Sequence, residues 1–418
     1  MPSDSPATST ARASIAFALG CVFFAYAFIQ RVSPSVMTAE LMRDFAVGGT
    51  ALGILSAMYL YPYALAQLPV GMLMDRYGPR PLLTITALIC AISSCWFASA
   101  ESLLMASIAR GFVGVSVAFA FVGTLTIAAT FFHASRFALL SGIVFTVGMT
   151  GAVAGQVPLR ILVDLLSWRE TYYVLGAAAL MLAVLIVIFV PSRVPPATRR
   201  EGSALNGLGA VCTNRQNWLC AIAGFGASAT MLSFSGLWAV PWMTMTLGFD
   251  ERVAAGISSM IFVGWGMSSP VLGWLSDRLG TRKPILVGGA LVALIALVLI
   301  VYGRLTSPLL LGALFFLHGA GACSMVVCFS LCRENNIAAN SATAISLVNM
   351  CIVAGGAVMQ PLLGWLLDLR WDGQLREGVR HYTVAAFDGA LLGLIVVLGI
   401  ALLCALLIRE TGCKSVAR

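Results

Sequence analysis

Three arginines interrupt hydrophobic stretches of this sequence, where a positive charge is costly. Arg31 closes one long apolar run, Arg110 opens another, and Arg160 lies near the end of a third. A guanidinium withdrawn from water needs an acceptor, and its N–H groups suit carboxylate or phosphate oxygens. We therefore predict that Arg31 binds an anion; the alternative is a side chain that extends its charged head to the nearest aqueous surface. Arg110 either contacts the ligand or braces neighbouring helices, and Arg160 is spaced to pair with Asp164.

Uncharged polar side chains accompany Arg31. Gln30 precedes it, and Tyr59, Tyr63 and Gln67 follow at intervals of four in the next apolar run. Residues four apart share one face of a helix, so this face joins aromatic rings to an amide. We predict that Gln30, Tyr63 and Gln67 line the wall of a ligand cavity; a packing or interfacial role for the tyrosines is the alternative.

Two glutamines occupy equivalent places in the two halves of the chain. Gln156 precedes Asp164 by eight residues, and Gln360 precedes Asp368 by the same interval. Each aspartate is followed shortly by a tryptophan. Symmetry-related glutamines of this kind are placed to face one cavity from both sides.

A single histidine, His318, lies deep in a hydrophobic run. Its unperturbed pKa near 6.5 makes it the best candidate in the chain for binding and releasing a coupling proton inside the membrane. A purely hydrogen-bonding role is the simpler alternative. We expect the second half of the chain to contribute four residues to the ligand site: Trp238, His318, Asn349 and Gln360.

The acidic residues restrict the chemistry further. Every Asp and Glu lies in a tail, in a turn or near the boundary of an apolar run. The three arginines therefore predict an unpaired positive field, which favours an anionic ligand over a cationic one. No phosphate-binding loop, metal-ligand spacing or nucleophile motif is present, so we expect neither an enzyme nor a bound cofactor or metal.

The elements that must hold these residues are membrane-spanning helices. Of the 418 residues 60% are hydrophobic and only 10% are charged, whereas soluble proteins carry about 25% charged residues. Runs of 18 or more residues without Asp, Glu, Lys or Arg number six between residues 13 and 192 and six between residues 216 and 408. A spanning helix needs about 20 mostly apolar residues, so the chain is predicted to be an all-α membrane protein with twelve spans in two six-helix bundles.

A charged loop occurs twice at the same place in each half. GMLMDRYGPR, residues 71–80, returns 202 residues later as GWLSDRLGTR, residues 273–282. The pattern Gly-x-Leu-x-Asp-Arg-x-Gly-x-Arg resembles the signature loop of the major facilitator superfamily, whose fold is the twelve-helix architecture above. The resemblance implies that both loops serve the conformational cycle, through Gly71, Asp75, Arg76, Gly78 and Arg80 and their counterparts Gly273, Asp277, Arg278, Gly280 and Arg282. Gly71 is expected to let two helices approach closely.

Domain boundaries and orientation follow from the same pattern. We predict an N-terminal bundle over residues 1–190, a cytoplasmic linker rich in Pro, Arg, Ser and Gly over 191–215, and a C-terminal bundle over 216–418. Basic residues concentrate in the tails and in the turns on the same side, which predicts that both termini are cytoplasmic. We expect the membrane to be a bacterial inner membrane. The net charge of +8 then reflects membrane orientation rather than nucleic-acid binding.

Further residues resemble one branch of the superfamily. FIQRVSPSVM around Arg31, LGILSAMYLYPYALAQLPVG and the segment with Trp238, Pro241 and Trp242 are similar to permeases for organic anions such as sugar acids and phosphate esters. That resemblance implies that Arg31 contacts the substrate anion. It also implies that Arg110, followed four residues later by Gly114, belongs to a motif of the superfamily's fourth membrane span. Gln30 stands where some members have an acid, so proton coupling at that pair is not implied.

The resulting hypothesis is a monomeric secondary transporter, surrounded by membrane lipids, that moves a small organic anion by alternating access. Its partners are the substrate and a coupling ion or counter-substrate. The alternatives are a carrier of neutral amino acids or dipeptides, whose carboxylate also suits Arg31, then a drug-efflux antiporter, and then a transporter-like solute sensor.

Overall fold

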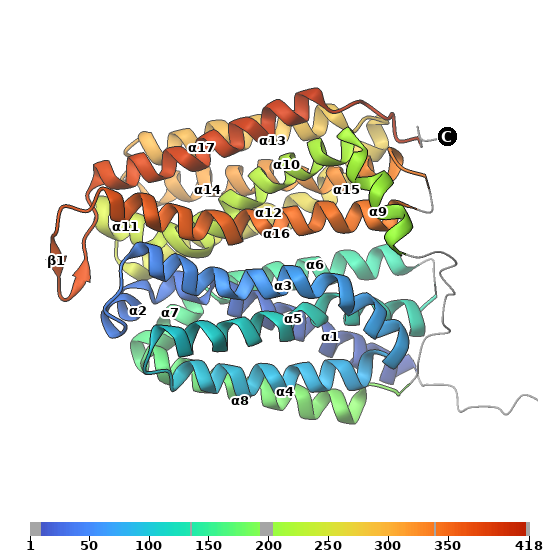
Figure 1. Ribbon diagram of the computed structural model, residues 1–418, viewed down its shortest axis with the longest axis horizontal. Helices are drawn as coiled ribbons and strands as arrows, with labels where there is room; N and C mark the ends of the chain where they lie inside the picture. Colours follow the sequence, from blue (N-terminus) through green and yellow to red (C-terminus); the bar gives the residue numbers. More distant parts are fainter. Residues whose placement is uncertain (1–9, 134–135, 193–203, 338–339, 415–418) are drawn as a thin grey trace, which may run out of the picture.

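The computed structural model describes residues 10–133, 136–192, 204–337 and 340–414. The chain folds into long helices that run side by side in two groups (Figure 1), which we call the first half (residues 10–192) and the second half (residues 204–414). The helices of the first half are α1 (Thr10–Val32), η1 (Ser33–Val36), α2 (Thr38–Asp44), α3 (Gly49–Tyr77), α4 (Pro79–Ala98), α5 (Leu103–Phe131), α6 (Phe137–Ala154), α7 (Val157–Leu165) and α8 (Trp168–Phe189).

The second half has the same succession with more interruptions. Its helices are α9 (Ala204–Thr213), α10 (Arg215–Ala229), η3 (Thr230–Trp238), α11 (Ala239–Leu247), α12 (Glu251–Leu279), α13 (Lys283–Tyr302), α14 (Pro308–Ala322), η4 (Cys323–Val326), α15 (Val327–Glu334), α16 (Ser341–Leu369) and α17 (Val384–Leu407). A short hairpin of β1 (Leu375–Arg376) and β2 (Val379–Arg380) joins α16 to α17. Residues 204–213 of the predicted linker therefore form a helix, while residues 193–203 lie outside the described part.

Elementary helix chemistry sets many of these boundaries. Proline occupies the first turn of α4, α13 and α14, where its missing N–H is not needed. Ser102, Ser307 and Thr383 cap α5, α14 and α17 by accepting a backbone N–H. Gly78 and Gly280 end α3 and α12 inside the two charged loops, with φ of +74° and +64°, which glycine adopts without strain.

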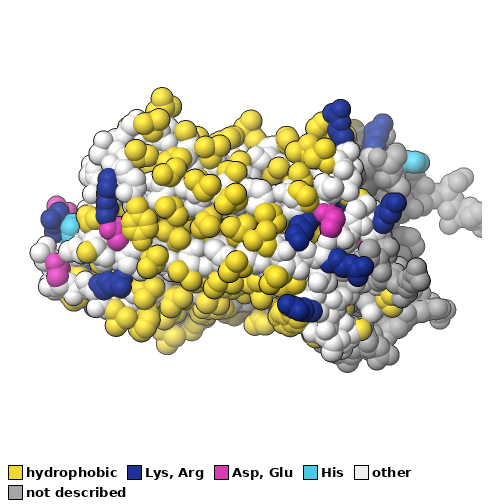
Figure 2. All heavy atoms as spheres, turned by 90° about the horizontal axis from the view of Figure 1, so that it is seen from above, with side chains coloured by type: hydrophobic (Ala, Val, Ile, Leu, Met, Phe, Trp, Pro, Cys, Tyr) yellow, Lys and Arg dark blue, Asp and Glu magenta, His cyan; other side chains and the backbone are white. Residues whose placement is uncertain are grey.

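The helices have the composition and surface of a membrane protein. Among the described residues, eleven helical segments are long and apolar enough to cross a bilayer, and α2 with the start of α3, bent by 112°, gives a twelfth if counted as one span. Figure 2 shows apolar side chains over the middle of the molecule and charged ones toward its two ends. The predicted all-α membrane architecture is confirmed.

The two ends of the molecule differ. We call the end where α1 begins and α17 finishes the termini end, and the opposite end, which carries β1 and β2, the hairpin end (Figure 1). The halves meet where α3 packs along α16, α12 along α6 and α7, and η1 against η3. A Cβ on Gly53 would lie 2.5 Å from the Gln360 carbonyl oxygen, so α3 and α16 cross almost backbone to backbone near the hairpin end.

Candidate functional site

The site begins with a break in α1. Pro34 has no N–H, so the carbonyl of Gln30, four residues earlier, loses its helical partner. Two side chains replace that partner: Ser33 Oγ donates to this oxygen at 3.0 Å and Arg110 Nη1 donates at 2.8 Å. Arg110 is fully buried and also donates to the Tyr172 hydroxyl at 3.2 Å. The sequence left two roles open for Arg110, and in this structure it braces the backbone beside Arg31.

Arg31 itself lies among aromatic rings. Its guanidinium carbon is 4.5 Å from the ring centre of Phe28, 4.8 Å from that of Tyr63 and 5.6 Å from that of Tyr59. The residue is 9% exposed, and its Nε is buried without a hydrogen-bond partner in the described part of the chain. No described carboxylate forms an ion pair with it. Ring faces attract a cation but carry no net charge, so the charge of Arg31 is not neutralised by the described residues around it.

The tyrosine face of α3 forms beside Arg31. The rings of Tyr59 and Tyr63 stack with their centres 6.0 Å apart, which confirms that the two residues share one face. Tyr59 donates its hydroxyl to the Ala27 carbonyl at 2.8 Å. Gln67 is half-buried, and its Nε2 is buried without a partner among the described residues. Arg31, Tyr63 and Gln67 therefore have polar groups to offer a ligand.

Gln30 points elsewhere. Its Nε2 contacts the Tyr26 hydroxyl at 2.6 Å and Ser94 Oγ at 2.9 Å, inside the first half. Successive residues of a helix project about 100° apart, so Gln30 and Arg31 do not share a face. The structure does not bring Gln30 to the surroundings of Arg31.

In the second half, Trp238 and Gln360 contact each other. Trp238 Nε1 donates to the Gln360 carbonyl at 3.0 Å, and Gln360 Nε2 donates to the Leu232 carbonyl at 2.8 Å. Both side chains are buried. Asn349 is half-buried on α16, and no hydrogen bond of its side chain is seen within the described ranges.

His318 is held inside the second half. Its Nδ1 lies 2.8 Å from the Ala293 carbonyl and its Nε2 lies 2.9 Å from Thr230 Oγ1. A carbonyl only accepts, so Nδ1 carries a proton, and the hydroxyl satisfies the other nitrogen. The structure gives both ring nitrogens partners from the same half and does not bring the ring to Arg31.

The prediction that Arg160 contributes an unpaired positive charge is wrong, because it pairs with three carboxylates. Its pairing with Asp164 is confirmed at 2.5 Å, but it also pairs with Glu40 at 2.8 Å and with Glu251 of the second half at 2.5 Å. Asp164 in turn binds Arg252 at 2.7 Å. The pairs Arg160–Glu251 and Asp164–Arg252 thus join the two halves at the hairpin end. The unpaired charge is reduced to Arg31 and Arg110.

Asp368 forms a second bridge between the halves, which the sequence did not reveal. Its carboxylate accepts the backbone N–H of Gly49 at 3.0 Å and of Thr50 at 2.8 Å, and it also accepts the hydroxyls of Thr50 and Tyr382, both at 2.6 Å. Arg380 lies 3.1 Å away. Asp368 therefore caps α3 from the opposite half. The equal spacing of Gln156–Asp164 and Gln360–Asp368 was the available signal, because both aspartates now prove to join the halves.

The two charged loops lie at the termini end. Gly71 and Gly273 have open space where a Cβ would be, so the expected close packing at Gly71 is wrong for this conformation. Arg76 and Arg278 lie over the rings of Tyr77 and Trp274. Arg80 donates to Ser192 and to the Val187 carbonyl, and Arg282 pairs with Asp277 at 2.7 Å. The side chain of Asp75 lies outside the described residues.

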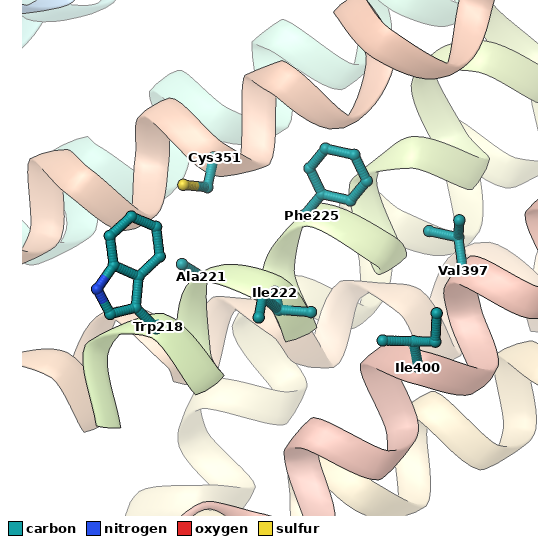
Figure 3. Close-up of a pocket in the computed structure, with 7 residues that line it drawn as sticks. All are labelled: Trp218, Ala221, Ile222, Phe225, Cys351, Val397 and Ile400. Atoms are coloured by element: carbon teal, nitrogen blue, oxygen red, sulfur yellow. The ribbon is translucent and has the colours of Figure 1, made fainter. Parts of the chain in front are cut away.

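An apolar pocket of about 290 Å³ lies away from these residues, between α10, α16 and α17 (Figure 3). Its lining includes Trp218, Ile222, Phe225, Cys351, Val397 and Ile400. With no charged lining residue it cannot neutralise an anion, and we do not assign the ligand site to it.

The fold is that of a polytopic membrane protein, and comparison with known proteins identifies its family. A family model described as the Major Facilitator Superfamily matches residues 17–360 and 229–412. The chain belongs to this family of transporters and is not an enzyme. Among solved structures, a bacterial homologue of the human lysosomal transporter Spinster, in an inward-facing and unoccupied conformation, superposes with a TM-score of 0.78 at 16% identity, over 96% of this chain and 98% of that one.

Several curated relatives carry names as organic-anion transporters, and two of them illustrate the likeness. A probable sulfoacetate transporter, SauU, from Cupriavidus necator is 24% identical over 63% of this chain, and the match spans 64% of that relative's length. A putative tartrate transporter from Agrobacterium vitis is 23% identical over 82% of this chain and 81% of its own length. The resemblance to the organic-anion branch is thereby confirmed.

Proposed function

We propose that this transporter carries a small organic anion across the bacterial inner membrane and that Arg31 binds its acid group. The observation that carries the proposal is the guanidinium of Arg31, held 9% exposed among Phe28, Tyr59 and Tyr63 without a described carboxylate partner. The attraction between this buried charge and a bound anion is stronger than it would be in water, because the effective dielectric constant is lower inside the protein. The relatives named for sulfoacetate and tartrate support the same substrate class.

Alternating access is the mechanism we propose. The hydrogen bonds and ion pairs that join the halves within the described residues gather toward the hairpin end, at Asp368 with Gly49 and at Arg160 with Glu251. They keep that end closed, and breaking them opens it. We place the hairpin end outside the cell, because basic residues concentrate at the termini end.

Binding to purified protein tests the proposal. Arg31→Gln removes the charge and Arg31→Lys keeps it, while Arg304→Gln, at an exposed ion pair with Asp388, controls for a lost arginine elsewhere. A hydrogen bond to a charged group contributes about 1.5–3 kcal/mol, so we expect Arg31→Gln to weaken binding of an organic diacid by about tenfold to a hundredfold. Arg31→Lys should retain part of the affinity, and Arg304→Gln should retain all of it.

Thermal stabilisation by ligands and isothermal titration both report this affinity. A diacid bound equally well by the wild type and Arg31→Gln would contradict the assignment of Arg31. Stabilisation by neutral amino acids or cationic drugs in place of diacids would favour the other substrate classes.

A further inference from the structure

An apolar groove interrupts the packing of the second half around α10. The span Arg215–Leu247, which begins with α10, is the most buried of the candidate membrane spans in the described chain. The large apolar side chains that it nevertheless exposes are Trp218 and Ile222, at 42% and 40%. Both line the pocket of about 290 Å³ between α10, α16 and α17 (Figure 3). A helix that is otherwise covered by its neighbours is therefore uncovered at this groove.

The lining of the groove fits a hydrocarbon chain. Its other residues carry no charge: Ala221, Phe225, Cys351, Val397 and Ile400. Ile400 is 46% exposed, so the groove is open along the side of the helices that faces the membrane. An unfilled groove loses the dispersion contacts of its lining atoms. Its volume is just below the ~300–1,000 Å³ of pockets that enclose a whole small-molecule ligand, so an acyl chain of the bilayer suits it better than a compact solute.

Two arginines lie where α10 and α17 reach the termini end. Arg215 begins α10 and precedes Trp218 by three residues and Ile222 by seven, so the three share one stripe of the helix. Arg409 follows the end of α17, and its backbone N–H donates to Gln216 Oε1 at 2.8 Å. This hydrogen bond brings Arg409 beside the first turn of α10. The groove therefore has basic residues at its termini end.

Neither of these guanidiniums is neutralised by the described chain. Arg215 and Arg409 are exposed, and neither forms an ion pair within the described residues. Glu410, the neighbour of Arg409, directs its carboxylate to backbone N–H groups at the start of α13. Figure 2 shows further basic side chains toward the termini end. Basic groups beside a gap between spanning helices recognise phospholipid head groups.

We propose that the groove binds an acyl chain of an anionic phospholipid and that Arg215 and Arg409 bind the phosphate of the same lipid. The lipid comes from the membrane leaflet at the termini end, which is the cytoplasmic leaflet in the orientation proposed above. It is a resident of the protein surface and not the transported solute. The inference therefore does not depend on the substrate class.

The lipid would brace the helices that support the second-half residues. α10 continues directly into η3, and Gln360 of α16 donates Nε2 to the Leu232 carbonyl of η3 at 2.8 Å. An acyl chain between α10, α16 and α17 adds contacts to all three helices. A lipid that binds only the folded protein raises its apparent stability, and the size of the shift reports the affinity.

Thermal unfolding of the purified full-length protein in detergent, titrated with lipid, tests the proposal. Phosphatidylglycerol is compared with phosphatidylcholine of the same acyl chains and with inorganic phosphate. We expect phosphatidylglycerol to bind at least about tenfold more tightly than phosphatidylcholine, and Arg215→Gln or Arg409→Gln each to reduce that preference about fivefold. Inorganic phosphate should give no stabilisation that depends on these arginines.

Matched variants separate the head group from the chain. Arg278→Gln is the control for the head group, because Arg278 is also exposed at the termini end but lies on α12, which does not line the groove. Cys351→Phe fills the groove and should weaken both lipids about tenfold. Cys351→Ser adds no volume and should leave the binding of both lipids unchanged.

Three outcomes would overturn the proposal. Equal binding of the two lipids would remove the phosphate contact, and binding that is unchanged in Cys351→Phe would remove the groove. Stabilisation by inorganic phosphate that is lost in Arg215→Gln and Arg409→Gln would show a site for free anions in place of a lipid site. The two arginines are exposed, so their variants keep the test decisive if Cys351→Phe does not fold. None of these measurements depends on Arg31, so the proposed function is tested separately.

Discussion

The two charged loops have matching sequences but different surroundings. In the second copy, Arg282 is buried between Asp277, 2.7 Å away, and Glu334, 2.9 Å away. In the first copy, Arg80 reaches Ser192 and a backbone carbonyl at the end of α8. The comparison teaches that residues outside the motif decide how firmly each copy is held. Glu334 and Glu410 fix the second loop to its own half.

Glu410 shows how the second copy is completed. It follows α17 and accepts the backbone N–H groups of Arg282, Lys283, Thr411 and Gly412 at 2.7–3.1 Å, so it caps the start of α13. Ser192 lies in the corresponding place after α8, and no carboxylate of the described residues forms an ion pair with Arg80. Among the described side chains, the second loop is held by charged partners and the first by a hydroxyl and a carbonyl.

The largest effect is expected from Glu334→Ala. The side chains of Arg282 and Glu334 are 7% and 6% exposed, so removing the carboxylate leaves a buried guanidinium whose one remaining charged partner in the described chain, Asp277, is exposed. Breaking such a pair costs about 3–5 kcal/mol. Thermal unfolding in detergent should show a large drop in Tm. Asp277→Asn is the control, because its side chain is 69% exposed and an exposed pair contributes ~0–1 kcal/mol. An equal decrease in Tm for both variants would contradict the prediction that Glu334 contributes more to stability than Asp277.

Glu410→Gln should have an intermediate effect that depends on pH. Partial burial alone would raise the pKa of Glu410, but four backbone N–H groups outweigh it and lower that pKa below its ordinary value of 4.5. A lowered pKa in the folded state contributes stability that is present above 4.5 and lost as the pH falls below it.

We therefore expect the free energy of unfolding of the wild type to exceed that of Glu410→Gln by about 1 kcal/mol at neutral pH. This difference should shrink as the pH is lowered. Unfolding measured at a series of pH values checks this, and a difference that grows toward low pH would show that Glu410 is not the cap we describe.

The smallest effect is expected from a change that gives the first loop a carboxylate like that of the second. Ser192→Glu places a carboxylate beside Arg80 and should make the first loop resemble the second. Both groups are near the surface, so a gain of only ~0.2–1 kcal/mol is expected. The same substitution in an Arg80→Gln background measures whether the gain depends on Arg80, and a gain of equal size there would argue against the pair.

The sequence was a good guide to features that depend on composition or local spacing. Apolar runs predicted the spans, the repeated decapeptide predicted the loops, and the i, i+4 interval predicted that Arg160 pairs with Asp164. The sequence also placed Gln30 beside Arg31, although neighbouring residues of one helix face different ways.

Contacts between the two halves could not be predicted from composition or local spacing. Arg160 meets Glu251 and Asp368 caps α3 only because the bundles close at the hairpin end, and the partners lie far apart along the chain. His318 is satisfied by a backbone carbonyl of another helix, and backbone acceptors leave no mark in a side-chain pattern.

The crossing of α3 and α16 has an evolutionary consequence. A side chain on Gly49 or Gly364 would collide with the backbone of the opposite helix, so both positions are restricted by the contact between the halves and not by the ligand. Phe28, Tyr59 and Tyr63, which surround Arg31, all belong to the first half and are not part of this crossing. We expect relatives with other substrates to vary around the ligand and to keep glycine at this crossing.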